Sequence, residues 1–211
     1  MIAIIDYGAG NLSSVKNALD FIGAKSLITS KSEEIKSADA IILPGVGSFG
    51  DAMNSMKQSS LIETVKEMAI SEKPFLGICL GLQLLFECSE EASEVSGLGV
   101  LKGTVKKFPM DMKLKIPHIG WNSLEFSNKS PLYDGIKNES YVYFVHSYYL
   151  EAKDLSQVAS HTNYGIDFHS SISDESLNLY ATQFHPEKSG DIGLAILRNF
   201  VKLQGGKSDV R

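Results

Sequence analysis

The sequence has few cysteines, a single tryptophan and no long apolar run. Its 211 residues include two cysteines, Cys79 and Cys88, which are too few for a disulfide framework and fit a reducing cytoplasm. No run reaches the roughly 18 apolar residues of a membrane-spanning helix, so no membrane association is predicted. The short apolar run that opens the chain has no basic residues before it. It therefore predicts a first core strand rather than a signal peptide.

Positive charge is also scarce. The chain has 20 Lys and Arg residues against 25 Asp and Glu residues, which gives a net charge of −5 at pH 7. The basic residues form no run that could follow a phosphate backbone, so no nucleic-acid partner is predicted. The Cys and His spacings typical of zinc sites are missing, and neither a metal nor a cofactor is predicted.

The first 90 residues alternate between strand and helix patterns. Hydrophobic residues make up 43% of the chain, enough for the core of one domain, which we predict over residues 1–204 with a tail at 205–211. Short apolar runs predict buried strands at 1–6, 25–30, 38–45 and 74–79. Helical spacing predicts helices at 11–23, 48–58, 60–73 and 80–90. This alternation predicts a parallel sheet covered by helices on both faces.

The pattern changes after Gly97, where strand-like segments dominate. Six of these segments are separated by Gly, Asn and Asp, and they lie at 100–108, 115–126, 141–150, 157–161, 165–173 and 177–184. An amphipathic helix over 191–204 closes the domain. We therefore predict an α/β fold with a mixed sheet.

The segment "GICLG" has the form of a nucleophile elbow centred on Cys79. In such an elbow the residues two before and two after the nucleophile come close together, and Gly77 and Gly81 meet that need. The elbow places Cys79 at the start of the next helix, where the helix dipole favours the reactive thiolate. It also aims the amide of Leu80 at a reacting carbonyl, which is half of an oxyanion hole. The alternative is a buried structural cysteine, as predicted for Cys88, which lacks the flanking glycines and falls in the predicted helix 80–90.

A cysteine nucleophile needs a base that another group orients. Among five histidines, His185 stands at the end of an apolar strand in "QFHPEKS", where Pro186 stiffens the turn and Glu187 can orient the ring. Strand ends of a parallel sheet share one edge, so Cys79 and His185 are expected to converge. His161 and His169 lack a nearby acid in a rigid setting and are interpreted as surface residues, and His146 is interpreted as structural.

"GICLGLQ" together with "QFHPEKS" resembles the class I (triad) glutamine amidotransferases. The further segments "IIDYGAGNLSSVKNAL", "LPGVGSFG", "PHIGWN" and "YFVHSYY" are similar to the branch of glutaminase subunits that serves histidine biosynthesis. The resemblance spans nearly the whole chain. It implies a three-layer, flavodoxin-like fold with a mostly parallel central sheet and added antiparallel strands. It also implies hydrolysis of glutamine by a Cys-His-Glu triad.

The resemblance assigns roles to individual residues. Cys79 is the implied nucleophile, His185 the general base and then acid, and Glu187 the orienting carboxylate. The amides of Val46, in "PGVG", and Leu80 form the implied oxyanion hole. The implied glutamine pocket consists of Gly47, Gln83, Glu91, Ser147 and Tyr148. The implied partner is a (β/α)8-barrel cyclase (synthase) subunit, which uses the ammonia and forms a heterodimer with this chain. The implied face for this partner consists of Asn11, Pro117, His118, Trp121 and Lys188.

Other interpretations remain open for several of these segments. "DYGAGN" could be a dinucleotide loop, but Ser13 occupies the position of the third glycine. "PGVG" could be an ordinary turn, and Trp121 could be a core residue, although its neighbours Gly120 and Asn122 favour a surface turn and an interface anchor. For the whole chain, the alternatives are a glutaminase subunit of another amination system, a cysteine hydrolase of the same fold, and a binding protein with a vestigial triad.

Overall fold

The protein is described by a computed structural model that covers residues 1–109 and 111–205. Its main sheet has a parallel half, in which the strand order is β2-β1-β3-β4-β13. These strands are β1 (Ile2–Ile5), β2 (Ser26–Thr29), β3 (Ala40–Gly45), β4 (Phe75–Cys79) and β13 (Leu179–Thr182). The first four fall within the predicted strands. β1, β3 and β4 are wholly buried because their apolar runs are covered on both faces, whereas the edge strand β2 is mostly half-buried.

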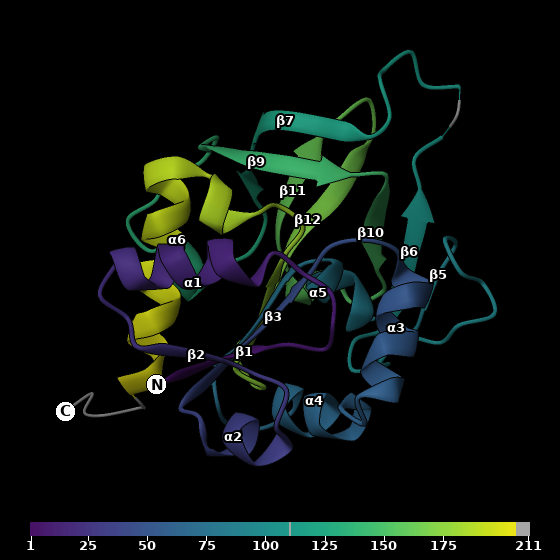
Figure 1. The fold of residues 1–211 in the computed structure, drawn as a ribbon. Helices are drawn as coiled ribbons and strands as arrows, with labels where there is room; N and C mark the ends of the chain where they lie inside the picture. Colours follow the sequence, from purple (N-terminus) through teal and green to yellow (C-terminus); the bar gives the residue numbers. More distant parts are fainter. Residues whose placement is uncertain (110, 206–211) are drawn as a thin grey trace.

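The antiparallel half continues the same sheet beyond β13. Its strands are β12 (Asp167–Asp174), β10 (Tyr148–Ala152), β6 (Gly103–Lys107), β11 (Val158–Asn163) and β8 (Glu125–Phe126). The two-residue strand β5 (Cys88–Ser89) pairs with β6 in parallel at the end of the strand order. A separate antiparallel pair joins β7 (His118–Ser123) to β9 (Tyr141–His146), and Figure 1 shows it at the top of the view. The predicted mostly parallel α/β sheet with added antiparallel strands is confirmed.

Helices cover both faces of the parallel half (Figure 1). On one face lie α2 (Ser32–Ser37), α3 (Phe49–Gln58), α4 (Ile62–Ala69) and α5 (Leu80–Leu84). On the other lie α1 (Leu12–Phe21) and α6 (Gly190–Lys202). Short 3₁₀ turns complete the elements: η1 (Pro131–Tyr133), η2 (Leu155–Gln157), η3 (Pro186–Lys188) and η4 (Leu203–Gly205). Of the predicted tail, residues 206–211 lie outside the described residues.

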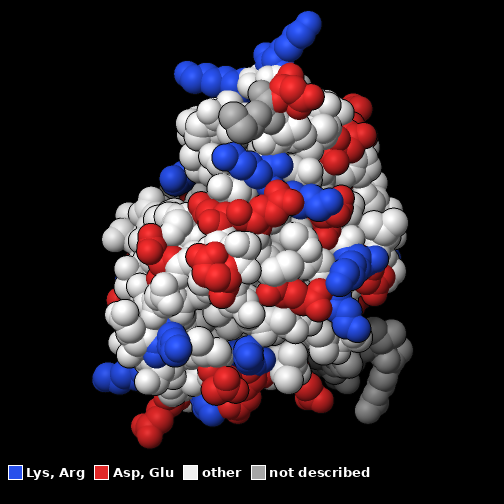
Figure 2. Space-filling model, turned by 90° about the vertical axis from the view of Figure 1, so that its right-hand side faces the viewer, with Lys and Arg blue, Asp and Glu red and all other residues white. Residues whose placement is uncertain are grey.

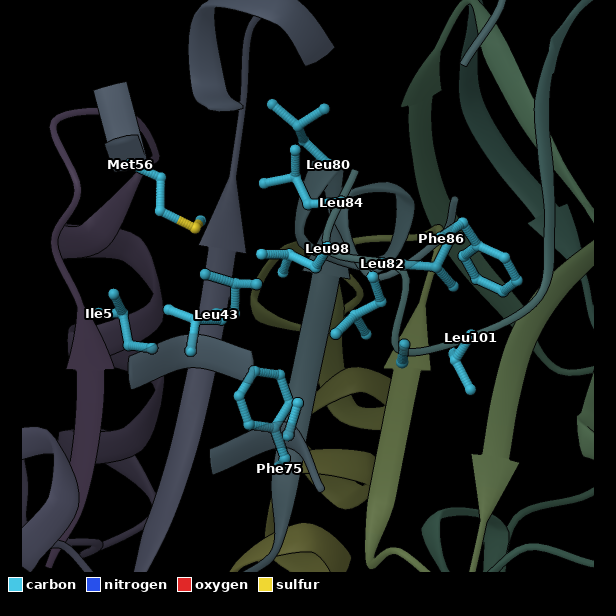
Figure 3. Close-up of a cluster of buried hydrophobic side chains, with 14 of the residues drawn as sticks. Ile5, Leu43, Met56, Phe75, Leu80, Leu82, Leu84, Phe86, Leu98 and Leu101 are labelled. Carbon is cyan, nitrogen blue, oxygen red and sulfur yellow. The ribbon is translucent and has the colours of Figure 1, made fainter. Parts of the chain in front are cut away.

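The core under α3, α4 and α5 fixes the position of the elbow. Figure 3 shows Leu80, Leu82 and Leu84 of α5 pointing into the same apolar cluster as Leu43 and Phe75 of the sheet. All five side chains are at most 3% exposed. Because burying a leucine contributes about 2 kcal/mol, this packing holds the helix that follows Cys79 firmly against the sheet.

Two sequence predictions about elements are wrong. The helix predicted over 80–90 ends at Leu84, and Cys88 lies in strand β5 instead. The carbonyls of Leu84, Leu85 and Glu87 accept hydrogen bonds from the segment 97–101 rather than from a continuing helix. The single strand predicted over 141–150 is divided at Ser147 between two sheets.

The surface carries no extended patch of positive charge on the face that Figure 2 shows, where acidic and basic side chains are interspersed. Lys106 pairs with Glu151, and Lys153 pairs with Glu87. Within the described part of the chain, the helices are too short or too polar for any of them to traverse a bilayer.

Candidate active site

The elbow at Cys79 has the backbone geometry that its glycines predict. Cys79 ends β4 and precedes α5 with φ 54° and ψ −106°, a conformation that non-glycine residues rarely adopt. A Cβ atom on Gly77 would lie 2.9 Å from the carbonyl oxygen of Gly81, and one on Gly81 would lie 1.9 Å from the carbonyl oxygen of Leu43. The predicted close approach of the two glycines is therefore confirmed, and the turn holds Cys79 in a strained, fixed position.

Cys88 lies in a different environment. It is half-buried in β5, and its Sγ lies 3.4 Å from the hydroxyl oxygen of Thr104. It does not line the pocket that contains Cys79. Both cysteines are free thiols, so no disulfide joins Cys79 to Cys88.

Strand register brings the candidate base to the elbow. Gly45 of β3 pairs with Cys79, and Thr182 of β13 pairs with Ile78 on the other side of β4. The loop after β3 and the segment after β13 therefore both leave the sheet beside Cys79, as expected for strand ends of a parallel sheet.

His185 and Glu187 form a buried pair directly after β13. Nδ1 of His185 lies 2.8 Å from Oε1 of Glu187, and their side chains are 2% and 1% exposed. Burial by itself lowers the pKa of His185, but hydrogen bonding and charge interactions with Cys79 and Glu187 outweigh it and raise the pKa to about 10. The ring is therefore an imidazolium, and its Nδ1–H donates a hydrogen bond to Glu187.

The other ring nitrogen of His185, Nε2, is the one available to Cys79. Among the described residues, Nε2 is buried and makes no hydrogen bond of ordinary geometry, although Cys79 is close enough to raise the pKa of the ring. Both residues line one pocket, without a formed hydrogen bond between them. Apo active sites commonly show such loose contacts, which tighten when substrate binds.

The turn that carries His185 is fastened to β9. The backbone N–H of His185 donates to the carbonyl of Tyr143 at 3.0 Å. The hydroxyl of Ser189 accepts from the N–H of Tyr143 at 3.0 Å and donates to the carbonyl of His185 at 2.6 Å. Four backbone groups, the N–H and the carbonyl of both Tyr143 and His185, are satisfied in this way, so β9 fixes the position of the candidate base.

A pocket of about 360 Å³ opens beside Cys79 and His185. Every residue predicted for the oxyanion hole and the glutamine pocket lines it, namely Val46, Leu80, Gly47, Gln83, Glu91, Ser147 and Tyr148. Gly47 has φ +100°, a value that suits glycine at the mouth of the pocket. One carboxylate oxygen of Glu91 accepts the N–H of Phe49 at 2.7 Å, which anchors this acid at the start of α3.

The pocket also contains residues that the sequence did not single out. His146 lines it, and Nε2 of His146 lies 2.9 Å from Nδ1 of His118. His146 Nδ1 must donate to the carbonyl of Tyr148, 2.8 Å away, so Nε2 accepts and His118 donates. Burial lowers the pKa of His118 to about 4 and that of His146 to about 3, so both rings are neutral.

The residues predicted for a partner face do not all lie at the surface. Trp121 is 55% exposed, and Pro117 and Lys188 are exposed at the rim of the same pocket. Asn11 is half-buried as the N-cap of α1. His118 is 2% exposed and stacks on Phe144 and Tyr164, so its side chain points inward.

Two local predictions need correction. Trp121 lies in strand β7 rather than in a turn, although its predicted exposure is confirmed. His161 does have an acid nearby, since its Nε2 lies 3.2 Å from Oε2 of Glu125 on the neighbouring strand. His161 and His169 face each other on β11 and β12, outside the pocket at Cys79.

Comparison with known proteins agrees with this geometry. The sequence matches the family described as glutamine amidotransferase class-I over residues 3–203, and the chain belongs to that family. Within the family it is similar to imidazole glycerol phosphate synthase subunit HisH of Methanocaldococcus jannaschii, with 51% identity over 96% of this chain and 100% of the relative. Subunit HisH 1 of Campylobacter jejuni (strain RM1221) is 48% identical over the same shares.

The fold agrees with a solved structure as well. A crystal structure titled as a glutamine amidotransferase superimposes with a TM-score of 0.72, covering 98% of this chain and 100% of the other at 19% identity. At that identity the likeness establishes the fold alone, which is the class I amidotransferase fold.

Proposed function

We propose that this protein is the glutaminase subunit of an imidazole glycerol phosphate synthase and that Cys79, His185 and Glu187 are its triad. The observation that carries the proposal is the buried His185–Glu187 contact of 2.8 Å in the same pocket as an elbow cysteine. Relatives about half identical over their full length support the choice of synthase. We take residues 1–204 as one amidotransferase domain of a cytoplasmic enzyme, where a reducing environment keeps Cys79 as a free thiol.

The chemistry follows from the placement of the groups. The Cys79 thiolate attacks the side-chain amide carbon of glutamine, and the amides of Val46 and Leu80 stabilise the oxyanion. The imidazolium of His185 gives its proton to the departing nitrogen, which leaves as ammonia and a thioester remains. His185 then takes a proton from water, the resulting hydroxide attacks the thioester, and glutamate leaves as the thiolate is restored. Glu187 keeps the ring in one tautomer throughout.

The ammonia is proposed to pass to a separate (β/α)8-barrel cyclase subunit bound as a heterodimer. Pro117 and Lys188 border the pocket, and the exposed Trp121 lies on the strand that begins directly after Pro117. A partner seated on these residues and on Asn11 would cover the mouth of the site. The cyclase would then use the ammonia to form imidazole glycerol phosphate and aminoimidazole carboxamide ribotide in histidine biosynthesis.

The test is glutamate production by the purified chain alone, with the cyclase, and with the cyclase plus its ribotide substrate. We expect low activity alone and a rise of about 10²–10³-fold in the full mixture. The "PGVG" loop supports this expectation because Gly45 and Gly47 leave the Val46 peptide free to choose between two orientations. Full activity of the isolated chain would favour a stand-alone glutaminase. Activation by the barrel of a different amination system, with none by the cyclase, would favour a paralogue.

A further inference from the structure

A directed chain of hydrogen bonds runs from a backbone carbonyl to the sulfur of Cys79. The carbonyl of Tyr148 accepts from Nε2 of Gln83 at 3.1 Å, and the same nitrogen donates to Oε1 of Gln183 at 3.0 Å. Nε2 of Gln183 in turn lies 3.7 Å from Sγ of Cys79. Gln183, which is distant in sequence, thus joins Gln83 to the nucleophile.

The direction of this chain follows from the carbonyl at its origin. A backbone carbonyl only accepts, so the Gln83 amide must present its nitrogen to Tyr148. That nitrogen then has a second N–H to give, so Gln183 must present its oxygen to Gln83. The remaining end of the Gln183 amide is its NH₂ group, which faces Cys79. The opposite orientation of either amide would place donor against donor or acceptor against acceptor.

The chain is buried and well anchored. Gln83 is 5% exposed and Gln183 is fully buried, so bulk water does not compete for their amides. The carbonyl of Tyr148 also accepts from Nδ1 of His146, which occupies its second lone pair and fixes its position. The N–H of Gln183 that points at Cys79 is therefore positioned before any substrate arrives.

The other groups around the sulfur leave a thiolate in need of a permanent hydrogen-bond donor, which the Gln183 amide supplies. The carbonyl of Val145, from β9, lies 4.0 Å from Sγ and disfavours a negative charge there. The buried hydroxyl of Tyr7, in the loop after β1, has its pKa raised by burial and by the charge of Cys79. His185, from the turn after β13, balances the thiolate but must surrender its proton during each turnover. Gln183 cannot lose its proton in this way.

We propose that Gln183 is a further catalytic residue, which donates a permanent hydrogen bond to the Cys79 thiolate. The inference rests on the proposed function, in which the thiolate appears twice: before it attacks glutamine and again when the thioester breaks down. Gln83 and the Tyr148 carbonyl act as positioning groups, because they set the orientation of the Gln183 amide. The loss of one such donor should lower the thiolate population by about two- to fivefold, and a negative charge in its place should lower it further.

The test is alkylation of Cys79 by iodoacetamide in a Cys88→Ala background, which leaves one thiol in the chain. Intact-mass measurements from about pH 5 to pH 9 follow the thiolate, since only that form reacts. Gln183→Glu replaces the donor by a negative oxygen. We expect it to move the midpoint of the alkylation profile up by about one pH unit or more and to lower the rate at pH 7 by about tenfold. Gln183→Met, which removes the donor without adding charge, should lower the rate by about two- to fivefold.

Gln58→Glu is the matched control, because it makes the same chemical change at an exposed position at the end of α3. Its alkylation profile should coincide with that of the background. Thermal unfolding identifies any variant that fails to fold, and Gln183→Met then decides the outcome if Gln183→Glu is lost. An unshifted profile in a folded Gln183 variant would overturn the inference. Because alkylation needs no glutamine, a failed glutaminase assay of the unmodified chain would count against the proposed function alone.

Discussion

Two buried histidines line the same pocket, yet at neutral pH one ring is positively charged and the other is neutral. His185 and His146 are 2% and 6% exposed, so burial disfavours the charged form of both. The pKa of His185 is nevertheless raised to about 10, whereas that of His146 is lowered to about 3. His185 has Glu187 and Cys79 as partners, while His146 has a backbone carbonyl and the neutral ring of His118. The hydrogen-bonding partners, not the degree of burial, therefore decide which ring is charged and which is neutral.

Removal of the charged ring of His185, or of its partner Cys79, should have the largest effect on glutamate production. We expect His185→Ala and Cys79→Ala each to lower glutamate production by about 10³-fold or more, because the base or the nucleophile is gone. Steady-state glutamate release in the presence of the cyclase is the measurement. Cys88→Ala is the matched control and should stay within about twofold, since Cys88 lies outside the pocket. A comparable loss at Cys88 would contradict the assignment of the nucleophile.

Glu187→Gln should sharpen the comparison by making His185 resemble His146. With the carboxylate gone, burial counts for more and the pKa of His185 should fall. We expect glutamate production to drop by about 10–10²-fold, less than for His185→Ala, because an orienting group matters less than the base it orients. Titration of the ring by NMR gives the pKa directly. A loss as large as that of His185→Ala would mean that the roles are misassigned.

The neutral pair, His118 and His146, should affect the stability of the fold rather than the rate of glutamine hydrolysis. The pKa values of His118 and His146 lie below the usual 6.5, so the unfolded chain binds more protons than the folded one in mild acid. Their contribution to stability is present above about pH 6.5 and is lost as the pH falls toward 4. Between pH 6.5 and 5 the loss should be about 2 kcal/mol for each ring. Denaturant unfolding at several pH values measures it.

His146→Gln is the variant for this stability test, because glutamine keeps a donor for the Tyr148 carbonyl and does not titrate. The variant should lose less stability than the unmodified chain over the same pH interval. Equal pH dependence in both proteins would show that His146 takes up no extra proton on unfolding.

The parts of the site that could be predicted are those with local sequence signals. The glycines around Cys79 follow from sterics within five residues, and His185 and Glu187 are two residues apart. The apolar runs of the parallel strands predict the sheet, whose register then brings both segments to one edge. These predictions needed no knowledge of distant contacts.

What could not be predicted depends on hydrogen bonds between segments far apart in the chain. Gln183 approaches Cys79 across 104 positions, and Gln83 reaches Gln183 across 100. The early end of α5 has the same cause, since residues 97–101 take the carbonyls that would have continued the helix. His118 points inward because aromatic rings from other elements stack on it, and a pattern of neighbouring residues contains no sign of that.

The attachment of the His185 turn to Tyr143 connects the candidate base to the proposed partner face. Tyr143 holds the backbone of His185, and its ring contacts Trp121 on the adjoining strand, with ring centroids 6.1 Å apart. Trp121 of the proposed partner face and Tyr143, which holds the backbone of His185, thus lie on the two strands of one sheet. A substitution at Trp121 or Tyr143 therefore changes the proposed partner face and the support of His185 at the same time.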